Sequence, residues 1–178
     1  PLLWKNRDTD FMQNHIDYVK GEKYNFIAVV NSANAYLKEA WMGTNSSGFA
    51  LMNTQSYNLV DVKGDEERGA ANGRVIYRAL EVCATVEDFC HFLDTISKPS
   101  DIEANFGVID AQGGAAMFEV DYHKYVMYDA NNPKDAPYGY IARTNFSFAG
   151  KVNEGAGYVR YMEADQVLMK ASATGSIT

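Results

Sequence analysis

The chain has 178 residues, of which 47% are apolar and 22% charged, as expected for one globular domain that buries a sizeable core. Its formal net charge of −7, with no run rich in lysine and arginine, argues against nucleic acid or an anionic membrane surface as a partner. No apolar run approaches the roughly 18 residues that span a bilayer, and the two cysteines do not suggest a disulfide framework.

The first stretch of the chain joins an apolar run to a cluster of charges. Residues 2–5 are predicted to end a strand, and residues 6–22 to form a loop broken at Gly21. Charged side chains crowded at a strand end indicate either a solvated loop or the floor of a site. The charged residues concerned are Lys5, Arg7, Asp8 and Asp10.

A further strand and a hairpin follow. Residues 24–30 are rich in aromatic and β-branched side chains, which favour a strand. Residues 40–42 and 49–53 are short apolar runs on either side of a turn signal at residues 45–48. We therefore predict a β-hairpin here.

Two helices are predicted in the middle of the chain. Residues 61–72 are charged and contain glycine, which is typical of a surface loop. In residues 73–83 the apolar residues recur with the period of a helix. A second helix begins after Thr85, which forms a capping signal with Asp88, and ends at Pro99.

The remaining sequence returns to strands before a last helix. The predicted strands are residues 105–110, 115–121, 124–128 and 138–144. Residues 111–114 form the turn between the first two, and residues 158–170 are predicted as a helix. Strands, two helices, strands and a helix in this order indicate an α+β fold with antiparallel sheets rather than a doubly wound sheet. Apolar residues on both faces of residues 26–30 favour a sheet packed between other layers.

No metal or phosphate signature is visible. His15, His91 and His123 lie far apart and lack the spacing of metal ligands. Gly113 and Gly114 belong to a predicted turn rather than to a glycine-rich phosphate loop.

Cys90 is the one tempting nucleophile, because His91 follows it. Adjacent residues on a helix point about 100° apart, so the two side chains are not expected to face each other. Cys90 also shares an apolar stripe with Cys83 and Leu93, which favours a packing role. A catalytic Cys90 is kept as an alternative.

Amide side chains occur where predicted strands end. Asn53 and Gln55 close the strand at residues 49–53, and Asn145 follows the strand at residues 138–144. Such an amide can hold a loop, or it can donate an N–H group to a developing oxyanion.

Several motifs, in order, resemble N-terminal-nucleophile hydrolases. Residues 4–8, Trp-Lys-Asn-Arg-Asp, resemble the Gly-Arg-Asn-x-Asp segment of the choloylglycine hydrolase group and the Gly-Gln-Asn-Trp-Asp segment of the penicillin acyltransferase branch. Residues 43–50 are similar to the Asn-x-x-Gly-(apolar)-Ala hairpin of these families, and residues 144–145 to their Thr-Asn element. The helices at 73–94 and the hairpin at 107–121 fall between them in the expected order, so the resemblance spans nearly the whole chain.

The resemblance implies a single domain over residues 1–178 with a four-layer αββα sandwich of antiparallel sheets. It also implies a cysteine at the mature N-terminus, whose α-amine, with an unperturbed pKa near 8, serves as the base. That cysteine would lie roughly 15 residues before Pro1. Because the sequence begins at Pro1 in what reads as mid-strand, we expect it to lack the natural N-terminus. The polar end at residues 172–178 leaves a C-terminal extension open.

Five residues carry over to catalytic positions of the family. Asp8 matches the Asp that orients the nucleophile's amine, and Lys5 stands where the family has an Arg near the sulfur. A cation there favours thiolate, although Lys cannot make the hydrogen-bonded fork that Arg makes. Asn145 matches the oxyanion-hole Asn, and Gln55 falls near a second site Asn. Arg160 matches a late family Arg, with a solvated helix face as its alternative.

Two further residues are predicted to contact substrate. Asn53 competes with Gln55 for the second site Asn, because the register there is uncertain by one or two positions. Tyr140 lies in the aromatic stretch at residues 138–140, which is suited to contact a ligand.

The implied chemistry is acyl transfer from a small-molecule amide, which requires no metal or organic cofactor. A thiolate attacks the amide carbonyl, the amine leaves, and water or another amine takes the acyl group. The alternative is a non-catalytic ligand-binding or structural protein that keeps the sandwich. Substrate identity, the choice between hydrolysis and transfer, formation of a homo-oligomer, and a cytoplasmic or exported location are all left open by the sequence.

Overall fold

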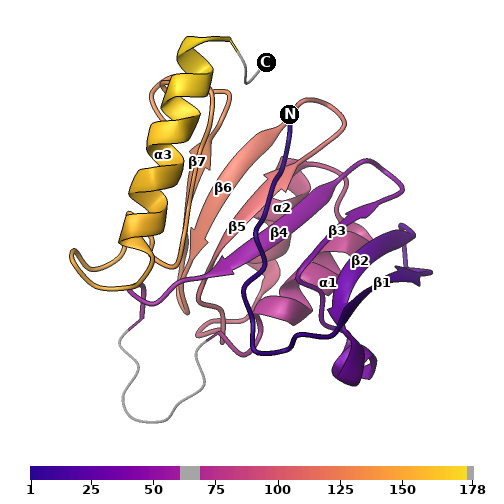
Figure 1. The fold of residues 1–178 in the computed structure, drawn as a ribbon. Helices are drawn as coiled ribbons and strands as arrows, with labels where there is room; N and C mark the ends of the chain where they lie inside the picture. Colours follow the sequence, from indigo (N-terminus) through magenta and orange to yellow (C-terminus); the bar gives the residue numbers. More distant parts are fainter. Residues whose placement is uncertain (61–68, 176–178) are drawn as a thin grey trace.

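The computed structural model describes residues 1–60 and 69–175. Within them, seven strands form one antiparallel sheet in which the spatial order follows the chain order (Figure 1). Most of the predicted charged loop at residues 61–72 lies outside the described residues. The strands are β1 (Asn14–Val19), β2 (Phe26–Asn31), β3 (Met42–Asn45), β4 (Ala50–Gln55), β5 (Ala104–Ile109), β6 (Ala115–Val120) and β7 (Tyr125–Asp129).

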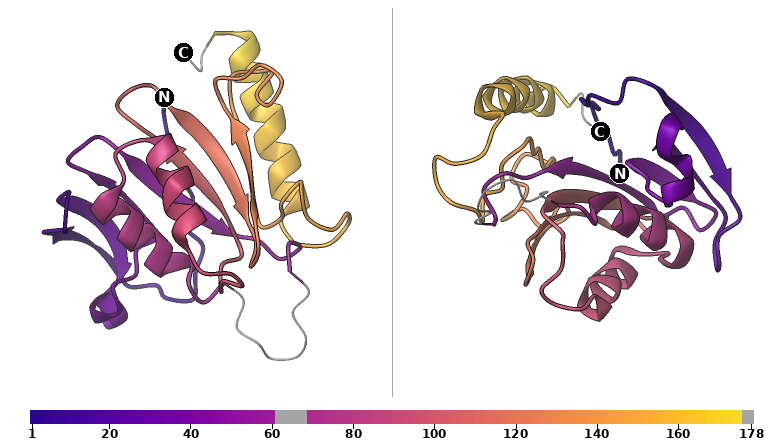
Figure 2. Two further views of the ribbon diagram at one scale, coloured as in Figure 1. Left: turned by 180° about the vertical axis from the view of Figure 1, so that it is seen from behind. Right: turned by 90° about the horizontal axis from the view of Figure 1, so that it is seen from below.

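The two predicted helices are present and cover one face of the sheet (Figure 2). They are α1 (Asn72–Val82) and α2 (Val86–Thr95), and the short 3-10 helix η1 (Ser32–Leu37) follows β2. Thr85 caps α2 through a capping box with Asp88, which confirms the sequence signal. The last helix, α3 (Tyr158–Ala173), lies on the opposite side of the sheet together with the N-terminal segment (Figure 2).

The hydrophobic core lies between the sheet and the helices α1 and α2. Phe89 of α2 is fully buried at its centre. Its ring lies 6.2 Å from that of Phe49, 5.9 Å from that of Phe106 and 5.1 Å from that of Phe118, with the last two pairs edge-on. One aromatic side chain thus joins α2 to the β3–β4 turn, β5 and β6.

The first nine residues are extended but do not form the predicted strand at 2–5. Leu3, Lys5 and Arg7 face inward, while the residues between them are exposed. No backbone hydrogen bond of the described residues ties this segment to a strand, because it crosses the face of the sheet instead of running beside an edge (Figure 1). Gly107 makes room for it, since a Cβ there would come within 2.9 Å of Leu3.

Two other predictions are corrected. Residues 14–19 were predicted as loop, yet they form β1, which pairs along its whole length with β2. This strand lies at the sheet edge with most side chains exposed, so it lacks the apolar alternation that marks half-buried strands. Residues 138–144 were predicted as a strand but have no strand structure, because side chains rather than a backbone ladder bind them to the sheet.

The α+β class with an antiparallel sheet is therefore confirmed. The described residues contain one sheet, and the predicted strands at residues 2–5 and 138–144 are both unpaired. The structure of the described chain thus does not itself contain the second sheet of a four-layer sandwich. No helix in this part of the chain is both long and apolar enough to cross a membrane.

We predict that Phe89→Ala lowers the free energy of unfolding by about 3–5 kcal/mol, because it removes a fully buried ring and leaves a cavity. Urea unfolding followed by circular dichroism measures the change. Tyr36→Ala is the matched control, since Tyr36 is 77% exposed and its loss should change stability by less than about 0.5 kcal/mol. Equal effects of the two substitutions would contradict the central role of Phe89.

Candidate functional site

Lys5 reaches into an opening of the sheet beside β4. Strand β3 pairs only with residues 50–52 of β4, so the last residues of β4 have no β3 partner on that side. The Lys5 ammonium donates hydrogen bonds there to the Trp41 backbone carbonyl (2.9 Å) and to Oδ1 of Asn53 (3.0 Å). Both acceptors are neutral, so the described structure gives this cation hydrogen bonds without a carboxylate.

The surroundings of Lys5 disfavour its charge. Burial, and next the positive charge of Arg7, lower the pKa of the Lys5 amine from 10.5 to about 7. Arg7 lies on the same side of the segment and is held by Asn14 (3.0 Å) and Asn31 (2.5 Å). Its guanidinium also lies 4.9 Å from the centre of the Trp41 ring. Lys5 is therefore a lysine that can exchange a proton near neutral pH.

The loop after residue 143 brings Asn145 to the other side of the same strand end. The Asn145 amide donates to the Gln55 backbone carbonyl at 2.9 Å and to Thr54 Oγ1 at 3.3 Å. Its oxygen accepts a 2.7 Å hydrogen bond from Arg160 of α3. The predicted site residues Asn145 and Arg160 are thus brought together, although they lie 15 positions apart.

The structure distinguishes Asn53 from Gln55. Asn53 is buried and contacts Lys5. Gln55, in contrast, accepts a hydrogen bond from the Asn72 side chain of α1 (2.8 Å) and donates to the Ser56 carbonyl (3.1 Å). The geometry therefore joins Asn53 to the lysine, and it directs the amide of Gln55 toward α1.

Neither Asp8 nor Tyr140 contacts the other predicted site residues in the hydrogen bonds of the described chain. Asp8 is among the exposed residues of the N-terminal segment. The Tyr140 hydroxyl donates to the Asp165 carboxylate of α3 at 2.7 Å, and burial together with this carboxylate raises the pKa of the phenol. The contact ties α3 to the loop, and a role of Tyr140 in substrate binding stays a prediction.

Cys90 has the surroundings of a packing residue. It is partly buried on α2 against the core, and its sulfur lies 3.8 Å from that of Met127. Burial raises the pKa of the Cys90 thiol, which disfavours the nucleophilic thiolate. Among the described residues, no group of three or more His, Cys, Asp or Glu side chains is placed to hold a metal ion.

Sequence reasoning missed several residues that build the site. Thr54 contacts the Asn145 loop at two points, through its hydroxyl to the Thr144 carbonyl (2.9 Å) and from the Asn145 amide. Trp41 supplies a carbonyl to Lys5 and a ring to Arg7. The charged cluster at residues 5–10 pointed to Arg7. Thr54 and the Trp41 carbonyl, in contrast, leave no signal in the sequence, because a threonine in a strand is common and every residue has a backbone carbonyl.

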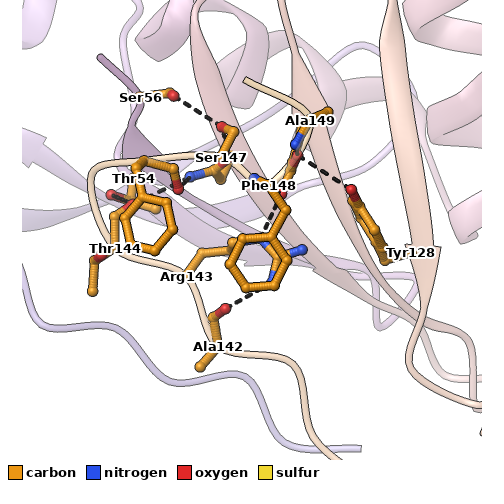
Figure 3. Close-up of polar contacts among 12 residues, drawn as sticks. Thr54, Ser56, Tyr128, Ala142, Arg143, Thr144, Ser147, Phe148 and Ala149 are labelled. Carbon is orange, nitrogen blue, oxygen red and sulfur yellow. Dashed lines mark hydrogen bonds and ion pairs between the residues drawn. The ribbon is translucent and has the colours of Figure 1, made fainter. Parts of the chain in front are cut away.

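The candidate site therefore lies at the end of β4, where Lys5 and Asn53 meet on one side and Asn145 and Arg160 on the other (Figure 3 shows the loop that carries Asn145). A cation and several amide side chains thus gather beside one antiparallel sheet. The comparisons define the family. The chain belongs to the acyl-coenzyme A:6-aminopenicillanic acid acyl-transferase family, which matches residues 2–163.

One solved structure shows the same fold, and a second is similar over part of its length. A mutant conjugated bile acid hydrolase from Clostridium perfringens matches with a TM-score of 0.53 and 13% sequence identity, over 93% of this chain and 67% of that chain. Penicillin V acylase from Agrobacterium tumefaciens matches with a TM-score of 0.45 and 19% identity, over 75% of this chain. The chain spans only 42% of the length of that acylase. No protein with curated function matches the sequence significantly.

We predict that Lys5 makes stability rise with pH. Below about pH 7 the folded state bears the full cost of the buried ammonium, whereas between pH 7 and 10.5 the folded protein has lost a proton that the unfolded chain keeps. Unfolding in this range therefore takes up a proton. The free energy of unfolding consequently rises with pH, by at most about 1.4 kcal/mol per pH unit.

Urea unfolding of wild type and Lys5→Met between pH 6.5 and 9.5 measures this contribution, which the variant should lack. Lys134→Met, at an exposed lysine, is the control and should keep the wild-type slope. Parallel pH profiles of wild type and Lys5→Met would show that Lys5 does not titrate in this range.

Proposed function

We propose that the protein is a hydrolase or acyltransferase of linear amide C–N bonds that uses an N-terminal cysteine preceding Pro1 in the chain. The observation that carries this proposal is the meeting of Lys5 with Asn53, and of Asn145 with Arg160, at the end of β4 in a chain of this family. In the whole protein, a second sheet then packs on the face away from α1 and α2 and completes a four-layer αββα sandwich.

The nucleophile is activated from two sides in this proposal. The free α-amine of the cysteine takes the thiol proton, and the exposed carboxylate of Asp8 orients that amine. Lys5, already held by Asn53, places its amine near the sulfur and favours thiolate while it is protonated.

The thiolate then attacks the carbonyl carbon of the amide, forming a C–S bond and an oxyanion. Asn145 donates an N–H group to this oxyanion, which replaces its longer contact to Thr54 at 3.3 Å. Arg160 binds the side-chain oxygen of Asn145 and so orients the N–H groups of the Asn145 amide. The C–N bond breaks, the leaving amine takes the proton from the α-ammonium, and water or an acceptor amine later cleaves the thioester.

The names of the structural neighbours suggest the first substrates to test. One neighbour is named as a penicillin V acylase and another as a conjugated bile acid hydrolase, and both of these molecules contain an amide bond. A protein that binds such amides without turnover would fit the alternative of a non-catalytic binding protein.

We predict that Asn145→Ala in the whole protein lowers kcat on penicillin V or a conjugated bile acid by about 100- to 1,000-fold, since one oxyanion donor is lost. The measurement is steady-state release of the amine, with circular dichroism to confirm folding. Asn132→Ala, in the turn after β7 where its side chain contacts Asp135, is the matched control and should retain full activity. Wild-type turnover by Asn145→Ala would exclude the oxyanion role.

We also predict that the mature protein from its host begins with cysteine. N-terminal sequencing and intact mass identify the first residue, and iodoacetamide should label that residue faster than Cys90, whose thiol pKa is raised by burial. A mature chain without Cys, Ser or Thr at its N-terminus would rule out the proposed nucleophile and favour a binding protein.

A further inference from the structure

A row of polar side chains crosses the sheet on the face away from α1 and α2. Thr54 of β4 lies opposite Asn105 of β5, and Asn105 lies opposite Glu119 of β6. The residues before and after Asn105 and Glu119 belong to the helix-side core, so these polar side chains point to the other face. Asn105 and Glu119 are almost completely buried there.

The loop that carries Asn145 lies on this row. Thr54 donates to the Thr144 carbonyl, and Asn105 donates to the carbonyls of Thr144 and Phe146, both at 3.1 Å. Asn105 in turn accepts a hydrogen bond from the Ser147 hydroxyl at 2.5 Å. The backbone on both sides of Asn145 is thus bound to side chains of the sheet.

Glu119 secures the loop at two further places. Figure 3 shows the loop residues Arg143, Phe148 and Ala149 that bind it. Glu119 Oε1 accepts hydrogen bonds from Arg143 (2.6 Å) and from the Phe148 N–H (2.9 Å), and its Oε2 accepts one from the Ala149 N–H (2.7 Å). The Tyr128 hydroxyl lies 3.5 Å from the same Oε2. One carboxylate therefore binds the loop both before and after Asn145.

The side chain of Arg143 is almost as fully enclosed as that of its partner. The side chains of Arg143 and Glu119 are 4% and 0% exposed. The guanidinium lies 3.8 Å from the ring centre of Phe148 and 4.8 Å from that of Tyr128, and it donates to the Ala142 carbonyl.

A buried ion pair of this kind is an inefficient source of stability, because apolar side chains of similar volume often stabilise as well or better. A fully hydrogen-bonded buried network does, however, hold one arrangement of the chain. The loop needs such a device, since residues 139–149 have no helix or strand ladder to place them.

We propose that Glu119, Arg143 and Asn105 are positioning residues that set the place and orientation of the Asn145 amide. The catalytic meaning of that position depends on the proposed function, whereas the positioning itself does not. Misplacement of a reacting group by about 1 Å typically costs on the order of 100-fold in rate, so a loosened loop should act on kcat.

The first test follows the Asn145 side chain directly. The NH2 signals of Asn145 in the 15N-labelled whole protein are assigned by their loss in Asn145→Ala. In Glu119→Gln these signals should shift and their exchange with water should speed up at least about tenfold, because the N–H of Ala149 and Arg143 lose the carboxylate. Unchanged signals in a folded Glu119→Gln would overturn the proposal.

Two further variants keep this test decisive. Arg143→Lys retains the positive charge but not the fork of donors, so it gives the same readout with less disruption if Glu119→Gln fails to fold. Arg78→Gln removes an exposed ion pair with Glu22 and is the control that should leave the Asn145 signals unchanged. Unchanged signals in Arg143→Lys likewise overturn the proposal.

The second test uses penicillin V as the substrate. Glu119→Gln should lower kcat about 100-fold with little change in KM, and it should add no further loss in the background of Asn145→Ala. Independent, multiplying losses would show a merely structural effect and contradict the positioning role. A whole protein that does not cleave penicillin V or a conjugated bile acid would overturn the proposed function, while the NMR test would still decide the positioning.

Discussion

The placement of Asn145 in the candidate site depends on the hydrogen bonds between the loop at residues 143–149 and the sheet face away from α1 and α2. A buried polar group without a partner costs about 1–3 kcal/mol, so Asn105 and Glu119 can lie buried only if the loop satisfies them. The loop, in turn, has no backbone ladder and can be ordered only by such side chains. Each therefore requires the other.

The two faces of the sheet are built on different principles. The face toward α1 and α2 is mostly apolar, and its packing stabilises the fold. The other face carries both small and polar residues. Gly107 leaves room for the N-terminal segment, and the row of polar side chains binds the Asn145 loop. The strand end of β4 lies where the N-terminal segment and the loop approach each other, which is why the site residues gather there.

Lys5 illustrates how burial can bring the pKa of a lysine near neutral pH. An exposed lysine holds its proton throughout the physiological range, but in the opening between β3 and β4 neutral acceptors and a neighbouring cation replace water. An arginine would stay charged throughout this range. A lysine at this position can therefore lose its proton near pH 7, which an arginine could not.

Local patterns in the sequence predicted much of the fold correctly. The helices α1, α2 and α3, the capping box at Thr85, and strands β2 and β4 to β7 follow from periodicity and turn signals, because these reflect contacts that neighbouring residues make. Strand β1 and residues 138–144 were predicted wrongly for the same reason. Pairing is made with a distant segment, so a polar run can be a strand and an apolar run can remain unpaired.

The candidate site divides along the same line. The sequence by itself determined the family, the α+β class and which residue types were available, since motifs in order carry that information. It could not show which of Asn53 and Gln55 contacts Lys5, place Arg160 beside Asn145, or reveal that Thr54, Asn105 and Glu119 bind the loop around Asn145. Only the tertiary structure decided these points, because they depend on which side chains converge from distant strands and on how completely water is excluded around them.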